Sequence, residues 1–239
     1  HTGSVAFHYP LVHSVKVRKI HDAKSVPFSL GTLIRNEGDP PTGIADADNA
    51  YTFFGDTYDF YYNVHGRDSI DNHGLPMVGT INYCEFSCPW ANAGWSDVFQ
   101  RMVFGQGYAS ADDVISHELT HGVTTSESNL IYAYEPGAIN EAFSDIWGEF
   151  VDLTNGRGTD TDAVRWLMGE DIPIGAIRSM SDPTIFGDPD RRYSPFYYEG
   201  PFDNGGVHWN SGVINKLAYL LTDGDTFQGY TIEGIGIPK

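Results

Sequence analysis

Two histidines four residues apart could bind one metal ion. His117 and His121 stand in the run His-Glu-Leu-Thr-His, and a helix places residues i and i+4 on the same face, one turn apart. Neutral imidazole suits Zn²⁺, and Glu118 could stand beside the metal without binding it and act as a base. The alternative is a helix turn that carries two histidines for no chemical reason. Because a catalytic zinc usually takes three protein ligands, the question is whether the chain offers a third.

A third candidate ligand lies in the segment 137–151. Glu141 and Asp145 are four residues apart, so a helix would place both carboxylates on one side. Glu141 would complete a His₂Glu zinc set, and Asp145 would accept the spare ring N–H of a ligand histidine. Two solvated acids on an amphipathic helix are the alternative. The apolar residues of this segment recur at helical spacing: Ile139, Ala142, Phe143, Ile146, Phe150 and Val151.

The elements around these segments must hold the candidate ligands in place. Ser110 and Asp113 stand at capping-box spacing, so the histidine-bearing helix is expected to start near Ser110. Periodicity predicts strands up to about residue 34, at 77–83 and near 102–104, and helices at 45–64, 137–155 and 210–221. The aromatic stripe of the first helix is interpreted as core packing.

Composition narrows the class of protein. The 239 residues are 41% hydrophobic, enough for a core in one large or two small domains. A net charge of −18 excludes nucleic acid as an expected partner and favours cations such as Ca²⁺. No apolar run reaches the roughly 18 residues of a membrane helix, and the first residue is His1, which suggests a processed or excised segment. Cys84 and Cys88 could form a small disulfide loop or remain a free buried pair.

Three motifs in this order resemble the thermolysin-like family of secreted zinc neutral proteases. They are His117-Glu-Leu-Thr-His, Gly137-Ala-Ile-Asn-Glu-Ala-Phe-Ser-Asp and Asp203-Asn-Gly-Gly-Val-His. The resemblance runs from about Ile44 to the last residue. It implies an α+β fold with a β-rich N-terminal part (1–110), a central zinc-binding helix (111–124) and an α-rich C-terminal part (125–239). It also implies a secreted zinc endopeptidase that cuts on the N-terminal side of large apolar residues.

The resemblance assigns the catalytic groups. Glu118 is expected to take a proton from a zinc-activated water and later pass it to the leaving amine. Tyr132 and His208 are expected to donate hydrogen bonds to the oxyanion, with Asp203 orienting His208. The zinc ligands would be His117, His121 and Glu141, supported by Asp145 and Asn140.

The resemblance also assigns the substrate contacts. Asn92 and Ala93 match an edge strand that pairs with an extended peptide, a mode that depends little on side chains. Arg178 matches an arginine that binds the substrate carbonyl. Val114 and Ile177 match apolar positions of the specificity pocket.

Family members bind calcium near the zinc site, and several acidic positions match. Arg165, however, stands where the family often has Asp, and its charge would oppose Ca²⁺, so we expect at most one calcium ion. The alternative is a solvated acidic surface. The expected ligands are Asp113, Glu149, Asp152, Glu170 and the carbonyl oxygen of Leu167.

Two other functions compete with the endopeptidase interpretation, and the chain differs from the family pattern at its C-terminal end. Zinc aminopeptidases share the two-histidine motif, but the chain has no Gly-x-Met-Glu-Asn type motif to hold a free N-terminus. An inactive homologue or a zinc-stabilised binding domain is the second rival. The family continues past Gly234 with further helices, whereas this chain ends at Lys239. We therefore expect a truncated α-rich part that is partnered by a separate C-terminal fragment of the same precursor.

Overall fold

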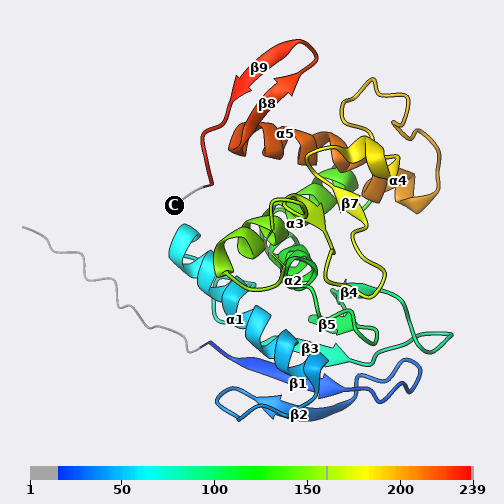
Figure 1. The fold of residues 1–239 in the computed structure, drawn as a ribbon. Helices are drawn as coiled ribbons and strands as arrows, with labels where there is room; N and C mark the ends of the chain where they lie inside the picture. Colours follow the sequence, from blue (N-terminus) through cyan, green and yellow to red (C-terminus); the bar gives the residue numbers. More distant parts are fainter. Residues whose placement is uncertain (1–15, 160, 238–239) are drawn as a thin grey trace, which may run out of the picture.

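The computed structural model describes residues 16–159 and 161–237, and the strand pattern expected before residue 16 lies outside them. The described part has a sheet at one end and helices at the other (Figure 1). Its elements are, in order, β1 (Arg18–Asp22), β2 (Thr32–Asn36), α1 (Ala45–His65), β3 (Met77–Ile81), β4 (Ala93–Ser96), β5 (Arg101–Phe104), α2 (Asp112–Glu127), α3 (Tyr134–Asn155), β6 (Leu167–Met168), β7 (Arg178–Ser179), η1 (Pro183–Phe186), α4 (Asp203–Asn210), α5 (Gly212–Thr222), β8 (Gly224–Phe227) and β9 (Tyr230–Glu233).

Five strands form one mixed sheet in the N-terminal half. Their order is β2-β1-β3-β5-β4; β1, β3 and β5 are parallel, and the outer strands β2 and β4 are antiparallel to their neighbours. Because β4 is an edge strand, one side of its backbone is not paired within the sheet. An edge of this kind can accept an extended peptide as an additional strand.

The long helix α1 packs on the sheet and supplies much of the core. Phe54 is fully buried, and a Cβ on Gly79 of β3 would come within 2.7 Å of its ring. The ring of Phe54 also lies 6.3 Å, between centroids, from that of Phe104 on β5. α1 ends at Gly66, whose φ of 65° is the left-handed conformation that commonly closes a helix. The aromatic stripe at 45–64 is therefore core packing, as its spacing predicted.

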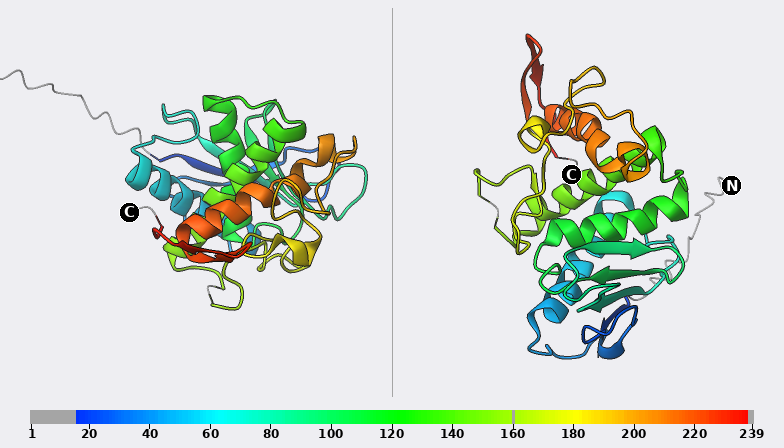
Figure 2. Two further views of the ribbon diagram at one scale, coloured as in Figure 1. Left: turned by 90° about the horizontal axis from the view of Figure 1, so that it is seen from above. Right: turned by 90° about the vertical axis from the view of Figure 1, so that its right-hand side faces the viewer.

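Helices α2 and α3 lie side by side above the sheet (Figure 2, right). Gly148 of α3 permits this close approach, because a Cβ there would lie 2.7 Å from the carbonyl oxygen of Asp113 and 3.4 Å from the backbone nitrogen of His117. On another side α2 packs on β4, where the Trp95 ring lies beside Gly122. α2 is thus fixed between α3 and the edge of the sheet.

The expected capping box at the start of α2 is wrong. The helix begins at Asp112, and no side chain accepts a hydrogen bond at its N-cap. The hydroxyl oxygen of Ser110 instead lies 2.6 Å from the carbonyl oxygens of both Gly107 and Asp171. Ser110 therefore ties the loop before α2 to the loop after β6, because tertiary contacts compete for the same hydroxyl.

Near the C-terminus, α4 and α5 meet at Ser211, and α5 corresponds to the helix expected at 210–221. α4 includes a left-handed stretch in which Asn204 and Gly205 have φ values of 51° and 93°. A Cβ on Gly205 would collide with the ring of Tyr134, so the backbone and the neighbouring ring both require glycine there. This turn seats α4 against α3, above the region where α2 meets α3 (Figure 2).

Cys84 and Cys88, whose pairing the sequence left open, form a disulfide. The bond closes a small loop between β3 and β4. The chain leaves this loop just before Asn92, at the start of the edge strand.

Candidate metal centre and cleft

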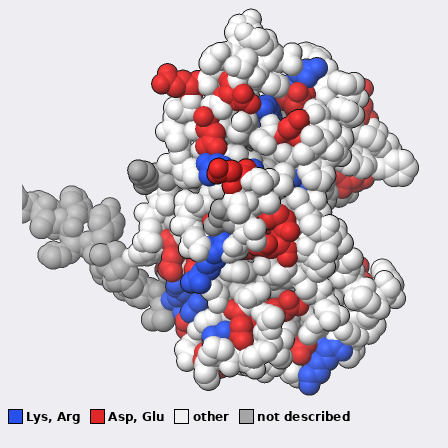
Figure 3. Space-filling model, viewed as in Figure 1, with Lys and Arg blue, Asp and Glu red and all other residues white. Residues whose placement is uncertain are grey.

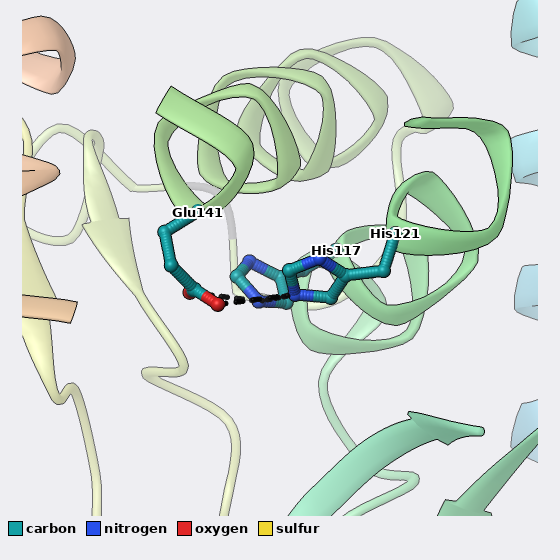
Figure 4. A group of neighbouring side chains, drawn as sticks. All are labelled: His117, His121 and Glu141. Carbon is teal, nitrogen blue, oxygen red and sulfur yellow. Dashed lines mark hydrogen bonds and ion pairs between the residues drawn. The ribbon is translucent and has the colours of Figure 1, made fainter. Parts of the chain in front are cut away.

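His117 and His121 project from one face of α2 toward Glu141 of α3 (Figure 4). Their Nε2 atoms are 3.0 Å apart. The carboxylate of Glu141 is fully buried, with Oε2 at 3.5 Å from His117 Nε2 and Oε1 at 3.4 Å from His121 Nε2. Within the described ranges, these residues are the group of three whose ligand atoms all lie within 4.8 Å of one another.

The outer ring nitrogens of both histidines are already engaged. His117 Nδ1 lies 2.8 Å from Asp145 Oδ1, and His121 Nδ1 lies 2.8 Å from Asn140 Oδ1. Because both partners are acceptors, each Nδ1 carries the hydrogen and each Nε2 presents a lone pair to the other histidine. Two such lone pairs 3.0 Å apart repel unless a proton or a metal cation lies between them.

The trio fits a tetrahedral zinc ion. Zinc ligands at about 2.0–2.1 Å from the metal lie roughly 3.3–3.4 Å from one another, close to the separations observed here. Burial would lower the pKa of His117, but the hydrogen bond and charge of Asp145, with the charge of Glu141, raise it. Burial would raise the pKa of Glu141, but His121, His208 and His117 lower it to about 2. Both shifts indicate a site that attracts positive charge.

Asp145 is the buried acceptor behind the candidate metal ligands. Besides its contact with His117, it accepts two hydrogen bonds from the Arg178 guanidinium, at 2.9 and 2.6 Å, and one from Asn215 Nδ2, at 2.8 Å. Burial would raise the pKa of Asp145, but Arg178 and His117 hold it well below its usual range. The contact from Asn215 was missed at the sequence level; its only signal is a polar residue within the apolar run of α5.

Tyr132, His208 and Asp203 lie on the opposite side of the trio. Tyr132 Oη donates to Glu141 Oε1 and lies 3.2 Å from His208 Nε2. His208 Nδ1 lies 2.6 Å from Asp203 Oδ1, and the backbone N–H of His208 donates to Asp203 Oδ2 at 2.9 Å. Burial and the charge of Glu141 raise the pKa of Tyr132, so its phenol stays protonated and remains a donor.

A cleft of about 640 Å³ passes over the metal trio. It runs between β4 on one side and α3, α4 and the chain before β7 on the other. The space-filling view shows the outline hollowed on the right, between the half with the sheet and the half with α4, and acidic side chains on both halves (Figure 3). Of the residues expected to act on a substrate, the lining includes Glu118, Tyr132, His208, Asn92, Ala93, Val114, Ile177 and Arg178, whereas Asp203 lies behind His208.

One end of the cleft is apolar. Val114, Ile172 and Ile177 converge on Gly169, where a Cβ would lie 3.3–3.6 Å from atoms of all three. Met168 lines the same end. Of these residues, Val114 and Ile177 were expected from the sequence, whereas Met168 and Ile172 belong to no motif and reach the cleft through β6 and the loop after it.

The acidic residues expected to bind calcium gather beside α2 and α3. Burial raises the pKa of Asp113 to about 7, that of Asp152 to about 11 and that of Glu170 to about 8, and neighbouring carboxylates add to each increase. Burial and Asp113 also raise the pKa of Glu149 well above its usual value. One buried carboxylate oxygen each of Glu149, Asp152 and Glu170 has no hydrogen-bond partner among the described residues. Unpaired buried carboxylates of this kind call for a proton or a cation.

Two features of this acidic cluster were not foreseen. Asp112 also belongs to it, since a Cβ on Gly158 would lie 2.9 Å from Asp112 Oδ1 and 3.5 Å from Asp152 Oδ1. Arg165 was expected to oppose a cation, but its guanidinium makes two hydrogen bonds to Asp223, each of 2.9 Å. Its charge is thus largely balanced by Asp223.

Comparisons with known proteins agree with this geometry. The family model "Thermolysin metallopeptidase, catalytic domain" matches residues 19–125, and "Thermolysin metallopeptidase, alpha-helical domain" matches residues 128–239. Among solved structures, the precursor of protealysin, a metalloproteinase from Serratia proteamaculans, aligns with a TM-score of 0.76 and 35% identity over 90% of this chain and 71% of that chain. The expected α+β fold of this family is thereby confirmed.

Curated relatives carry protease names. A zinc metalloproteinase of Renibacterium salmoninarum is 44% identical over 86% of this chain and 41% of its own length. Bacillolysin of Bacillus cereus is 45% identical over 92% of this chain and 39% of its own length. An extracellular metalloprotease of Pectobacterium carotovorum is 39% identical over 85% of this chain and 62% of its own length. The chain therefore spans less than two thirds of each of these relatives. None of the helices described in this chain is long and apolar enough to cross a membrane.

Proposed function

The chain belongs to the thermolysin family of metallopeptidases, and we propose that it hydrolyses peptide bonds as a zinc-dependent endopeptidase. One observation carries this proposal: two histidines with engaged Nδ1 atoms direct both Nε2 atoms, together with a buried carboxylate, at one point in the wall of a cleft. His117, His121 and Glu141 would hold the ion. Zinc bound there would supply a Lewis acid and activate a water for attack.

Glu118 is the proposed general base and acid. It lies on α2 between the two ligand histidines and lines the cleft, although its side chain is largely buried. We propose that its carboxylate takes the proton of the attacking water and later delivers it to the leaving amine.

Tyr132 and His208 are the proposed donors to the carbonyl oxygen as it gains negative charge. Tyr132 Oη and His208 Nε2 are adjacent at 3.2 Å, and both residues line the cleft beside the metal trio. His208 donates from Nε2 only in its charged form, because Asp203 already holds the hydrogen on Nδ1. Asp203 therefore fixes the orientation of the His208 ring, with Nε2 turned toward the cleft.

The cleft favours an extended peptide with a large apolar side chain after the cleaved bond. The unpaired edge of β4, with Asn92 and Ala93, offers backbone groups for strand addition. The apolar end around Val114 and Ile177 would take the side chain that follows the bond. Arg178 lies at this end, where its guanidinium, held by Asp145, would bind a substrate carbonyl. One relative is named an extracellular metalloprotease, and we propose that this chain is secreted too.

We also propose that one Ca²⁺ binds the acidic cluster. The buried, unpartnered oxygens of Glu149, Asp152 and Glu170 support this assignment, because Ca²⁺ prefers carboxylate and carbonyl oxygens. Asp113 and the carbonyl of Leu167 would complete the site, and Asp112 is a further donor.

The expected C-terminal partner remains a proposal that rests on the outer face of α5. Leu217 and Leu221 are 52% and 47% exposed on this helix. Further polypeptide that contains the family's later helices would cover these side chains. Mixing the chain with such a fragment and measuring complex formation by analytical ultracentrifugation tests this; wild type should bind it, and Leu217→Lys should not.

Peptide cleavage tests the proposed function. The zinc-loaded chain is expected to cut an internally quenched peptide before a large apolar residue, as mapped by mass spectrometry. A chelator should abolish cleavage, and Zn²⁺ should restore it. Stoichiometric zinc binding with no cleavage would instead favour a zinc-stabilised binding domain or an inactive homologue.

A further inference from the structure

One face of helix α2 runs along the whole length of the cleft. Val114, His117, His121 and Thr125 all line the cleft, and spacings of three and four residues place them along one helix face. At 1.5 Å per residue, the stretch from Val114 to Thr125 spans about 16 Å. The apolar pocket therefore lies at one end, the metal ligands in the middle, and Thr125 at the other end.

A fixed negative charge stands at the Thr125 end. Asp97, which directly follows β4, accepts hydrogen bonds at Oδ1 from Trp95 Nε1 at 2.7 Å and from Thr125 Oγ1 at 2.9 Å. Both donors are neutral, so they hold the carboxylate in place without balancing its charge. In the part of the chain that the structure describes, no cationic group lies within ion-pair distance of Asp97, and Oδ2 accepts no hydrogen bond.

No other group in the cleft balances this charge. Of the residues that line the cleft in the described chain, Arg178 is the only lysine or arginine. It lies at the apolar end and is paired with Asp145 at 2.6 Å. Trp95, also in the lining, adds an aromatic surface beside Asp97, with one edge packed against Gly122 of α2.

We propose that Asp97 and Trp95 form a subsite that selects a lysine or arginine side chain about three residues before the cleaved bond. The aliphatic stem would pack on the indole while the cationic head meets the free carboxylate oxygen. An extended peptide advances about 3.3 Å per residue, and the metal ligands lie about 9 Å from Thr125 along α2, which gives the three-residue offset. This inference rests on the proposed endopeptidase function, because the apolar pocket fixes which side of the bond faces Asp97.

A matched set of peptides tests the subsite. The peptides share one sequence and carry Lys, Gln or Glu at one of the four positions before the cleaved bond. For the zinc-loaded wild type we expect kcat/KM to be about 3- to 10-fold higher with Lys than with Gln at the third position, the range for an exposed ion pair combined with a cation–π contact. Glu there should be the poorest substrate. The preference should shrink in 1 M salt, since the carboxylate is exposed.

Two variants separate the subsite from the overall charge of −18. Asp97→Asn keeps an oxygen for both hydrogen bonds but removes the charge, so the ratio of kcat/KM with Lys to kcat/KM with Gln should fall to about 1. Asp97→Glu keeps the charge on a longer side chain and should retain part of the preference for Lys. Glu233→Gln removes one charge from β9, which lies far from β4 (Figure 1) and contributes no residue to the cleft lining, and should leave the ratio as in wild type.

The outcomes distinguish this inference from the proposed function. An equal Lys/Gln ratio in wild type and Asp97→Asn overturns the subsite, as does an equal loss in Glu233→Gln. If the wild type cuts none of the peptides, the proposed function fails; the same Lys/Gln comparison is then read as peptide affinity by fluorescence anisotropy. Equal affinities in that case overturn the subsite as well.

Discussion

Replacing Asp145 with asparagine should weaken both the fold and the metal site. Asp145 is fully buried and interacts with His117, with Arg178 through two hydrogen bonds, and with Asn215. The amide would keep one acceptor but turn an N–H₂ group toward donors and leave the Arg178 charge uncompensated. Breaking a buried pair in this way typically costs about 3–5 kcal/mol, and losing a carboxylate that orients a ligand histidine lowers metal affinity about 10- to 100-fold.

Denaturant unfolding and zinc competition with a chelator measure these two effects. The folded-state pKa of Asp145 is lowered, so its contribution is present at neutral pH and is lost as pH falls below the usual value of about 4. The stability gap between wild type and Asp145→Asn should therefore be full at pH 7 and close in acid. Asp203→Asn is the matched control, because Asp203 orients His208, which is not a proposed ligand; zinc affinity should be unchanged. A variant Asp145→Asn within threefold of wild type in zinc affinity, and within 1 kcal/mol in stability, would refute the reasoning.

Three further predictions concern other parts of the structure. Tyr132→Phe should lower kcat about 10²- to 10³-fold through loss of one donor, and a kcat within threefold of wild type would remove it from the mechanism. Gly148→Ala should destabilise the chain by about 1–3 kcal/mol, because its methyl would press on the backbone of α2; an unchanged urea midpoint would contradict this. The folded-state pKa values of Asp113 and Asp152 are raised above the usual value of about 4. Without calcium, the folded protein is therefore most stable when both groups are protonated, and it loses this stability as pH rises above about 4. Added Ca²⁺ should raise the melting temperature of the zinc-loaded protein more at pH 8 than at pH 5.5, and an equal rise at both would contradict the site.

Much of the metal centre could be predicted from the sequence because its geometry is local. The i, i+4 spacing of His117 and His121 becomes a shared helix face wherever the segment is helical. The same spacing places Glu141 and Asp145 on one side of α3. That the two helices pack together was a tertiary assumption, and it came from the need of a catalytic zinc for a third protein ligand.

The remaining contacts depend on tertiary packing that no spacing encodes. Asn215 reaches Asp145 from α5, and Asp97 meets Thr125 because β4 packs on α2. Ser110 was assigned to a helix cap, but its hydroxyl is used by two neighbouring loops. The ion pair between Arg165 and Asp223 could not be predicted either, because the sequence shows the position of a charge along the chain but not which carboxylate lies beside it in the fold.

Glu118→Gln tests the central claim most directly. The amide keeps the size of the side chain and lies outside the proposed ligand set, so the variant should bind one zinc ion per chain with wild-type affinity. It cannot take a proton from the attacking water, so cleavage of the quenched peptide should fall by about 10²- to 10⁴-fold. A zinc-loaded variant that cleaves at the wild-type rate would contradict the account.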